Sequence, residues 1–301
     1  MKFNKQLPVY ILMATVFFSC SKDDENKDGT GTNTSTQCSI KITSSDAPVI
    51  NDKFILIEAN TDNVNVDSII GINGSDKTWD FSDLAPDGDE DTLFFQAASA
   101  GVNAADFPSA DFVFSDDEEM YIKVNTTGLD IIGATTNEEG LEVAITNPMS
   151  FIPYSLEMGT TIIDEFVLSA YQKDTIDTTF AGFPPLVDQP IVISLTQTNS
   201  NTFNVDGCGK VTTPYGEYDC LRYTVEAGDA DLSGTISGNL TLTGTDFTLP
   251  IPDADLDDAE ADFNLFENKT YVWINKATKF PVVIVVTDEN GDIDSVEYLK
   301  D

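Results

Sequence analysis

The sequence predicts an all-β fold, either an antiparallel β-sandwich or an open curved barrel, with little helix. Stretches of alternating polarity recur along the chain, and they are rich in β-branched and aromatic residues, as is typical of strands. Turn signals separate these stretches at intervals of roughly eight to twelve residues, the spacing found in sandwiches and barrels. The clearest of them are residues 53–59, 119–128, 166–171, 190–198, 234–249 and 279–299.

Two hairpins are predicted within this pattern. The pair Asn290-Gly291 lies between two alternating runs, which is the strongest short signal for a two-residue type I′ turn. A second turn is predicted at residues 213–216, with Pro at its second position and Gly at its fourth. Strands therefore flank both turns.

Three other segments are informative about the organisation of the chain. Residues 270–275 ("TYVWIN") are apolar on both faces of a strand, so a central buried strand is expected. Residues 253–266 have apolar residues at roughly helical spacing, and an acidic loop is the alternative. Residues 182–190, rich in proline, form a rigid connector and are the best candidate boundary between an N-terminal and a C-terminal half. We expect one continuous domain over residues 38–301.

The N-terminal segment has the order of a secretory signal peptide. Lys2 and Lys5 precede an apolar run at residues 7–18, and Ser19 leads into Cys20. The run is shorter than the about 20 residues of a transmembrane helix. A cysteine at the cleavage position resembles the lipobox of bacterial lipoproteins, in which this cysteine becomes the acylated N-terminus. The resemblance implies a signal peptide at residues 1–19, lipidation of Cys20 and anchorage to a membrane.

The residues after Cys20 carry a second resemblance. The stretch "SKDDE" at 21–25 is similar to the acidic export signal that Bacteroidota place behind the cysteine of surface lipoproteins, which implies an outer-membrane location facing the exterior. Residues 20–37 are predicted to form a flexible acidic tether, because no large apolar residue follows the cysteine. Segments at 79–84, 107–112 and 209–223 resemble uncharacterised secreted proteins and lipoproteins of Bacteroidota, for which no activity is established.

Charge and composition exclude several classes of function. The net charge is −37 at pH 7, so nucleic acid and anionic lipid are poor partners. The chain contains no histidine, which removes Ser-His-Asp and Cys-His nucleophiles and histidine-containing zinc sites. The ordinary explanation of such acidity is solubility.

Cysteine and aromatic residues supply the candidate site residues. Cys208 and Cys220 are almost symmetric about the turn at 213–216, so we expect a disulfide between them. Cys38 then remains as a free thiol or pairs with another chain. Trp79 lies in a turn-rich acidic stretch and is the aromatic residue expected to be exposed and to stack on a sugar ring. Arg222, the only arginine, either clamps a ligand carboxylate or sulfate or forms an internal ion pair.

Calcium is the only cofactor that the sequence suggests. Asp253, Asp255 and Asp257 supply hard oxygen ligands but do not complete an EF-hand, and a solvated acidic loop is the alternative reading. The acidic clusters at 87–91 and 288–294 have the same two interpretations, a calcium site or a solvated loop. The cluster at 288–294 is explained by its hairpin turn.

The functional expectation follows mainly from the predicted location. We expect a surface-exposed lipoprotein that is not an enzyme and that binds an extracellular glycan or polymer, or acts as an accessory to a cell-envelope protein. One alternative is a β-barrel carrier of lipid or another apolar ligand. The other is a carboxylate-based glycoside hydrolase, which needs two acidic side chains about 5 to 9.5 Å apart.

Overall fold

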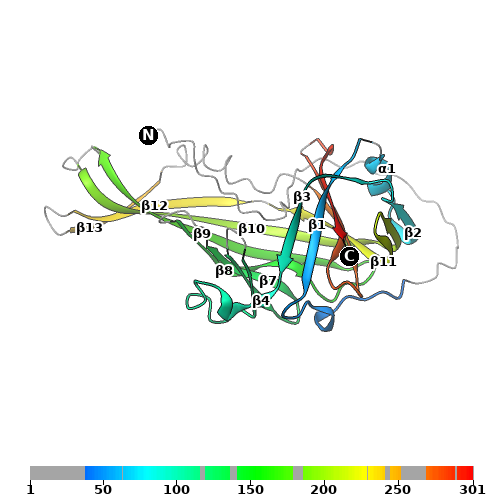
Figure 1. Ribbon diagram of the computed structural model, residues 1–301. Coiled ribbons are helices and arrows are strands. Elements are labelled where there is room, and N and C mark those ends of the chain that lie inside the picture. Colours follow the sequence, from blue (N-terminus) through cyan, green and yellow to red (C-terminus); the bar gives the residue numbers. More distant parts are fainter. Residues whose placement is uncertain are drawn as a thin grey trace.

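A computed structural model describes residues 38–300, except for residues 63, 116–118, 136–140, 179–185, 229, 241–244, 252–268 and 289. The fold is all-β, as predicted, and the strands belong to one large, mostly antiparallel sheet (Figure 1). Helical structure in the described residues consists of α1 (Val66–Ile70) and two short 3-10 turns, Ser44–Asp46 and Ala98–Ala100. No helix among these residues has the length and apolar character needed to span a membrane.

The strands in chain order are β1 (Lys53–Asn60), β2 (Gly74–Asp80), β3 (Ala85–Phe94), β4 (Gln96–Ala97), β5 (Phe112–Ser115), β6 (Glu119–Val124), β7 (Gly128–Thr135), β8 (Leu141–Pro153), β9 (Thr161–Thr178), β10 (Leu186–Thr213), β11 (Gly216–Ala227), β12 (Asp231–Leu240), β13 (Thr245–Pro250), β14 (Thr270–Asn275), β15 (Pro281–Thr287) and β16 (Ile293–Lys300). Their order in the sheet is β3-β1-β16-β15-β14-β11-β10-β9-β8-β7-β6-β5-β4, with β12, β13 and β2 attached beside β10.

The sheet curls so that its two ends come together. Strands β3 and β4 stand at opposite ends of the strand order, yet a single residue, Phe95, separates them in the chain. The Phe95 ring is fully buried and packs edge-on against Phe54, Phe112 and Phe114. This aromatic cluster therefore holds the ends of the curved sheet together, and we call the curled part of the sheet the roll.

Strand β10 pairs with four other strands, and we call it the spine of the sheet. One of its edges pairs with β9 through residues 186–204 and then, in parallel, with β2 through residues 207–212. Its other edge pairs with β12 through residues 191–198 and with β11 through residues 201–213. Strands β12 and β13, with the parts of β9 and β10 beside them, extend away from the roll (Figure 1, left), and we call this extension the arm.

Each part of the sheet has its own core. The roll is filled by large aromatic side chains, and Trp79, Phe81, Trp273 and Phe280 are almost fully buried there. Strand β14 is buried as predicted for residues 270–275. The arm has a small separate core of Ile191, Ile193, Ile236 and Ile251.

The two predicted hairpins form, and one has a different turn. Thr213 pairs with Gly216, so the turn at 213–216 is confirmed. Strands β15 and β16 also form a hairpin, but the loop runs from Asp288 to Asp292 and the type I′ prediction is wrong. The Asp288 Oδ1 atom accepts the N–H groups of Asn290 (2.9 Å) and Asp292 (2.8 Å), which stabilises the wider loop. Among the described residues of this loop, only Gly291 takes a positive φ, of 84°.

The connector at 182–190 does not separate two halves of the sheet. Strands β9 and β10 pair with each other in an antiparallel manner up to Thr178 and Leu186. The connector therefore joins the two strands of one long hairpin.

The predicted disulfide between Cys208 and Cys220 is wrong. Cys208 is bonded to Cys38, and Cys220 is a buried free thiol. In the β10–β11 register Cys208 lies opposite Leu221, and Cys220 lies opposite Gly209. Because neighbouring residues of a strand point to opposite faces, the two thiols lie on opposite faces of the sheet and do not meet.

Candidate functional site

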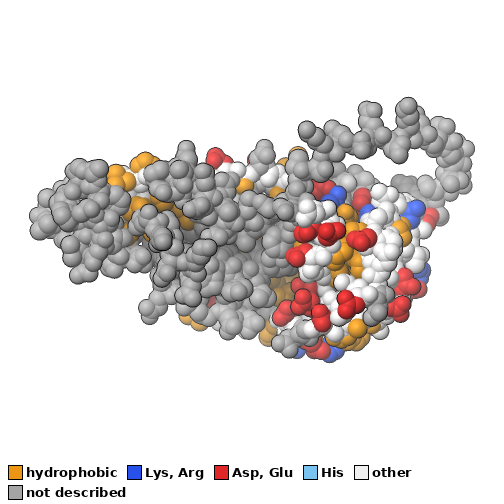
Figure 2. Space-filling view, turned by 90° about the horizontal axis from the view of Figure 1, so that it is seen from above, with side chains coloured by type: hydrophobic (Ala, Val, Ile, Leu, Met, Phe, Trp, Pro, Cys, Tyr) orange, Lys and Arg blue, Asp and Glu red, His pale blue; other side chains and the backbone are white. Residues whose placement is uncertain are grey.

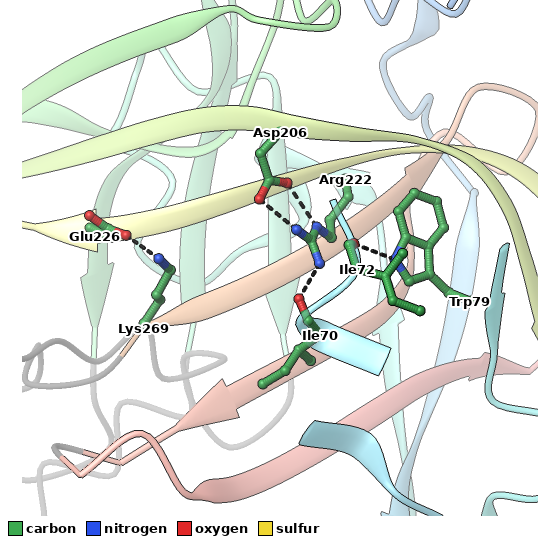
Figure 3. A network of polar contacts seen from close by, with 7 residues as sticks. All are labelled: Ile70, Ile72, Trp79, Asp206, Arg222, Glu226 and Lys269. Carbon is green, nitrogen blue, oxygen red and sulfur yellow. Dashed lines mark hydrogen bonds and ion pairs between the residues drawn. The ribbon is translucent and has the colours of Figure 1, made fainter. Parts of the chain in front are cut away.

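The two residues predicted to bind a ligand, Trp79 and Arg222, are both buried and belong to one network of polar contacts (Figure 3). Trp79 is 0% exposed and Arg222 is 1% exposed. Arg222 donates from Nε to Asp206 Oδ1 (2.8 Å) and from Nη2 to Asp206 Oδ2 (2.5 Å), and its Nη1 donates to the Ile70 carbonyl. The internal ion pair is thus confirmed, and the expectation of an exposed Trp79 is wrong.

The surroundings of Arg222 explain why Trp79 is buried. Trp79 lies on β2, which packs beside β10, and its Nε1 donates to the Ile72 carbonyl at 2.9 Å. The Arg222 guanidinium lies 5.8 Å from the Trp79 ring, with the Tyr271 and Trp273 rings at 5.5 and 5.7 Å. These contacts hold residues 66–80 against the sheet, so the cluster has a structural role.

Local backbone geometry brings the ion pair together. The register of β10 against β11 shifts between Val205 and Gly207, and Asp206 is the extra residue of this bulge. At Gly207 a Cβ atom would come within 2.9 Å of the Trp79 ring. The absence of a side chain there lets the indole pack directly on the strand.

The predicted calcium ligands Asp253, Asp255 and Asp257 lie outside the described residues. Within the described part of the chain, no three acidic or cysteine side chains are grouped so that they could hold a metal ion. The Asp288 carboxylate of the third acidic cluster is occupied by its own hairpin loop.

A different set of polar residues stands out on β10. Gln197, Asn199 and Asn201 alternate along the strand, so their side chains share one face, and we call them the polar row. Their exposed fractions are 2%, 4% and 3%. Four of their buried atoms, Gln197 Oε1, Gln197 Nε2, Asn199 Oδ1 and Asn201 Oδ1, have no hydrogen-bond partner among the described residues.

The polar row is unusual on energetic grounds. A buried polar atom without a partner destabilises a protein by about 1–3 kcal/mol, and such atoms are rare in native structures. Four of them on three neighbouring side chains, without a partner in the described part of the chain, therefore mark a candidate site for ordered water or a bound molecule.

The polar row lies where the roll meets the arm. On the same face of β10, Ile191 and Ile193 precede it in the arm core, and Phe203 and Val205 follow it in the roll core. Along the edge of β10 the pairing passes from β11, at Asn201, to β12, at Thr198. The row is thus a polar interruption in an otherwise apolar surface.

Strand β9 supplies the residues directly opposite the polar row. Leu168 lies opposite Gln197, Phe166 opposite Asn199 and Asp164 opposite Asn201. Directly opposed residues of an antiparallel pair point to the same face. Asp164 therefore adds a carboxyl group to the end of the row nearest the roll.

Acidic groups, the half-buried Asp164 and the buried Asp130, continue from this end of the row. Asp164 Oδ2 accepts the N–H of Ser150 (2.8 Å), and the Ser150 hydroxyl donates to Asp130 Oδ1 (3.2 Å). Burial raises the pKa of Asp164 and of Asp130, and the charge of Asp130 contributes to the raised pKa of Asp164. Burial, followed by the charge of Asp130, also raises the pKa of Tyr154, whose hydroxyl has no hydrogen-bond partner in the described part of the chain.

A second acidic group lies on the roll. Glu58 and Glu297 are opposed on β1 and β16, and Asp91 lies on the neighbouring strand β3. Burial raises the pKa of Glu297 to about 7, and the charges of Asp91 and Glu58 add to the effect. Acidic side chains also gather around an apolar patch on the face seen from above (Figure 2).

Comparisons of the chain with protein-family models, curated proteins and solved structures found no match.

Sequence reasoning missed the polar row because "TQTNSN" at 196–201 looks like a solvated strand. A signal was nevertheless present. The alternate positions that hold Ile191, Ile193 and Leu195 continue in phase through the polar row to Phe203 and Val205. Polar residues at positions where the alternation predicts buried apolar side chains are the feature that would have identified the row.

Proposed function

We propose that this chain is an outer-membrane lipoprotein, anchored through Cys20 and facing the cell exterior, that binds a glycan chain at the polar row. The anchor rests on the signal-peptide pattern of residues 1–19 and on the acidic residues after Cys20. The proposal of a glycan ligand is based on one observation, the four buried atoms of the polar row that have no hydrogen-bond partner among the described residues.

The chemistry of the row suits a sugar. A hydroxyl group both donates and accepts hydrogen bonds, so one sugar residue can satisfy an amide oxygen and an amide nitrogen together. The apolar side chains on either side of the row, such as Leu195 and Phe203, suit the C–H faces of sugar rings. Successive side chains of the row are about 7 Å apart along β10, which is twice the rise per residue of a strand. An extended polymer that lies along β10 can therefore contact more than one of them.

Binding, and not hydrolysis, is the proposed activity. Of the two carboxyl groups described above, Asp164 and Asp130, the buried Asp130 accepts hydrogen bonds from both Asn125 and Ser150. A carboxyl group held on both oxygens stabilises the β6–β7 turn and the neighbouring strand. Because both oxygens of Asp130 are already engaged, Asp130 is poorly suited to act with Asp164 in two-carboxylate catalysis.

A carrier of apolar ligands is the second candidate function. The observation in its favour is the small apolar core of the arm, where Ile191, Ile193 and Ile236 share the face that carries the polar row. In this alternative the row would bind the polar head group of a lipid and the arm would bind its chain.

Thermal melting of the full-length chain with a ligand panel tests these proposals. The chain is kept in a polyoxyethylene detergent, which contains no sugar, and is melted with neutral and amino polysaccharides, with fatty acids and with calcium. A ligand that binds only the folded state raises the melting temperature. A rise with a polysaccharide is the expected result. A higher melting temperature with fatty acids alone would favour the carrier function. No change in melting temperature with any polysaccharide would contradict glycan binding.

The anchor is tested separately in cells. We expect the chain to fractionate with the outer membrane and to be accessible to external protease in intact cells. A Cys20→Ala variant should lose membrane association, and if it stays membrane-bound the proposed anchor is wrong.

A further inference from the structure

The unpartnered atoms of the polar row are mainly acceptors. Three of the four are oxygens, namely Gln197 Oε1, Asn199 Oδ1 and Asn201 Oδ1, and only Gln197 Nε2 is a donor. The Asn199 side-chain nitrogen, Nδ2, already donates to the backbone carbonyl oxygen of Gln197 at 3.4 Å. A ligand that donates hydrogen bonds therefore suits the three unpartnered oxygens of the row.

Asp164 adds to these acceptors. Its carboxyl group shares a sheet face with the directly opposed Asn201, and a carboxylate is an acceptor only. The Ser150 N–H occupies one site on Oδ2, which leaves further acceptor capacity on both oxygens. The end of the row nearest the roll thus combines an amide oxygen with a carboxylate.

No cation of the described chain satisfies this carboxylate. The ion pairs among the described residues involve other acidic side chains, such as Asp111 with Lys123 and Asp206 with Arg222. Neither Asp164 nor Asp130 takes part in any of them. A buried carboxylate is stable when a cation pairs with it. Without one, burial and the nearby Asp130 raise the pKa of Asp164.

On this basis we propose that the ligand of the polar row is an amino-sugar polymer, with one protonated amino group lying between Asn201 and Asp164. The inference rests on the proposed glycan binding and names its ligand class. An ammonium group supplies three donors, which can satisfy the Asn201 amide oxygen and the Asp164 carboxylate together. The net charge of −37 also attracts a cationic chain and speeds its encounter with the protein.

Three hexasaccharides with the same backbone and linkages separate the alternatives. Cellohexaose carries a hydroxyl group at the second ring carbon, chitohexaose carries an N-acetylamino group there, and the chitosan hexamer carries a free amino group. Each is titrated calorimetrically into the full-length chain in detergent, at a slightly acidic pH that keeps the amine protonated. The proposal predicts one-to-one binding of the chitosan hexamer that is at least about tenfold tighter than binding of the other two.

The other outcomes distinguish the two proposals. If cellohexaose or chitohexaose binds as tightly as the chitosan hexamer, glycan binding stands and the amino-sugar inference is overturned. If none of the three binds and the polysaccharide panel also gives no shift, the proposed function itself fails.

A pair of charge variants controls for nonspecific attraction to an acidic protein. Asp164→Asn removes the charge beside the row and keeps an acceptor for the Ser150 N–H. Glu165→Gln makes the same change of charge one residue away, on the opposite face of β9, where the side chain is exposed. We expect Asp164→Asn to weaken binding of the chitosan hexamer about tenfold, with no effect of Glu165→Gln. Equal effects of the two variants would overturn the proposal.

Discussion

The disulfide between Cys38 and Cys208 joins the first described residue to the spine of the sheet. The two residues are 170 positions apart in sequence, and their Cα atoms are 6.2 Å apart. The bond fixes the start of the domain to β10 in the roll, beside the register shift that positions Asp206.

Removal of this disulfide should strongly destabilise the fold. The chain-entropy model assigns about 5 kcal/mol to a bridge that closes so long a loop. We expect the Cys38→Ser variant to unfold at a clearly lower urea concentration than the oxidised parent chain, with reduction of the parent giving the same shift. Peptide mapping under non-reducing conditions provides the check on connectivity. A peptide that links Cys208 to Cys220 would contradict the structure.

The buried Arg222–Asp206 pair should contribute far more to stability than the exposed pairs. Arg222→Met removes a buried guanidinium and leaves its carboxylate partner unpaired, so we expect a loss of about 3–5 kcal/mol in the free energy of unfolding. Asp206→Asn in the same chain should recover part of this loss. The matched control is Lys210→Met, at the exposed Lys210–Glu217 pair, where we expect little or no loss because solvent screens the two charges. Similar losses at both pairs, measured by urea unfolding, would count against the structural role of Arg222.

Glu297 should make the protein more stable in mild acid than at neutral pH. Its pKa is raised from 4.5 to about 7 in the folded state, so the folded state keeps a proton that the unfolded state releases. The stabilisation from this proton is complete below about pH 4.5 and is lost as the pH rises through about 7. The full effect is about 3 kcal/mol. We expect Glu297→Gln to reduce the loss of stability between about pH 5 and about pH 8 in urea unfolding. An unchanged pH dependence would show that Glu297 is ionised in the folded state.

Local patterns in the sequence were enough to predict the fold class. The buried strand at 270–275 and the turn at 213–216 were predicted correctly, because alternation and turn chemistry depend on neighbouring residues. The turn after Thr287 was predicted with the wrong type. Asn290-Gly291 favours a two-residue turn, but the Asp288 side chain binds two backbone N–H groups of the loop and widens it.

Features that depend on distant parts of the chain were not predictable in the same way. The partner of Cys208 lies at the other end of the domain, so sequence proximity favoured the wrong cysteine. Trp79 has acidic neighbours that suggest exposure, but pairing of β2 with β10 and the packing of Arg222 bury it. The pairing of β10 with strands that are distant in sequence determines where Cys208 and Trp79 lie.

The central claim, that the polar row binds a glycan, is tested most directly at Asn199. Asn199→Leu keeps the approximate size of the side chain and removes a buried, unpartnered oxygen, whereas Thr198→Val changes the exposed opposite face of the same strand and serves as the control. The measurement is the melting temperature of each variant in detergent, with and without the glycan that stabilises the parent most. We predict that Asn199→Leu raises the melting temperature without ligand and abolishes the shift with ligand, while Thr198→Val changes neither. A lower melting temperature for Asn199→Leu with an unchanged glycan shift would contradict the account, because the row would then be satisfied within the chain and would not contact the ligand.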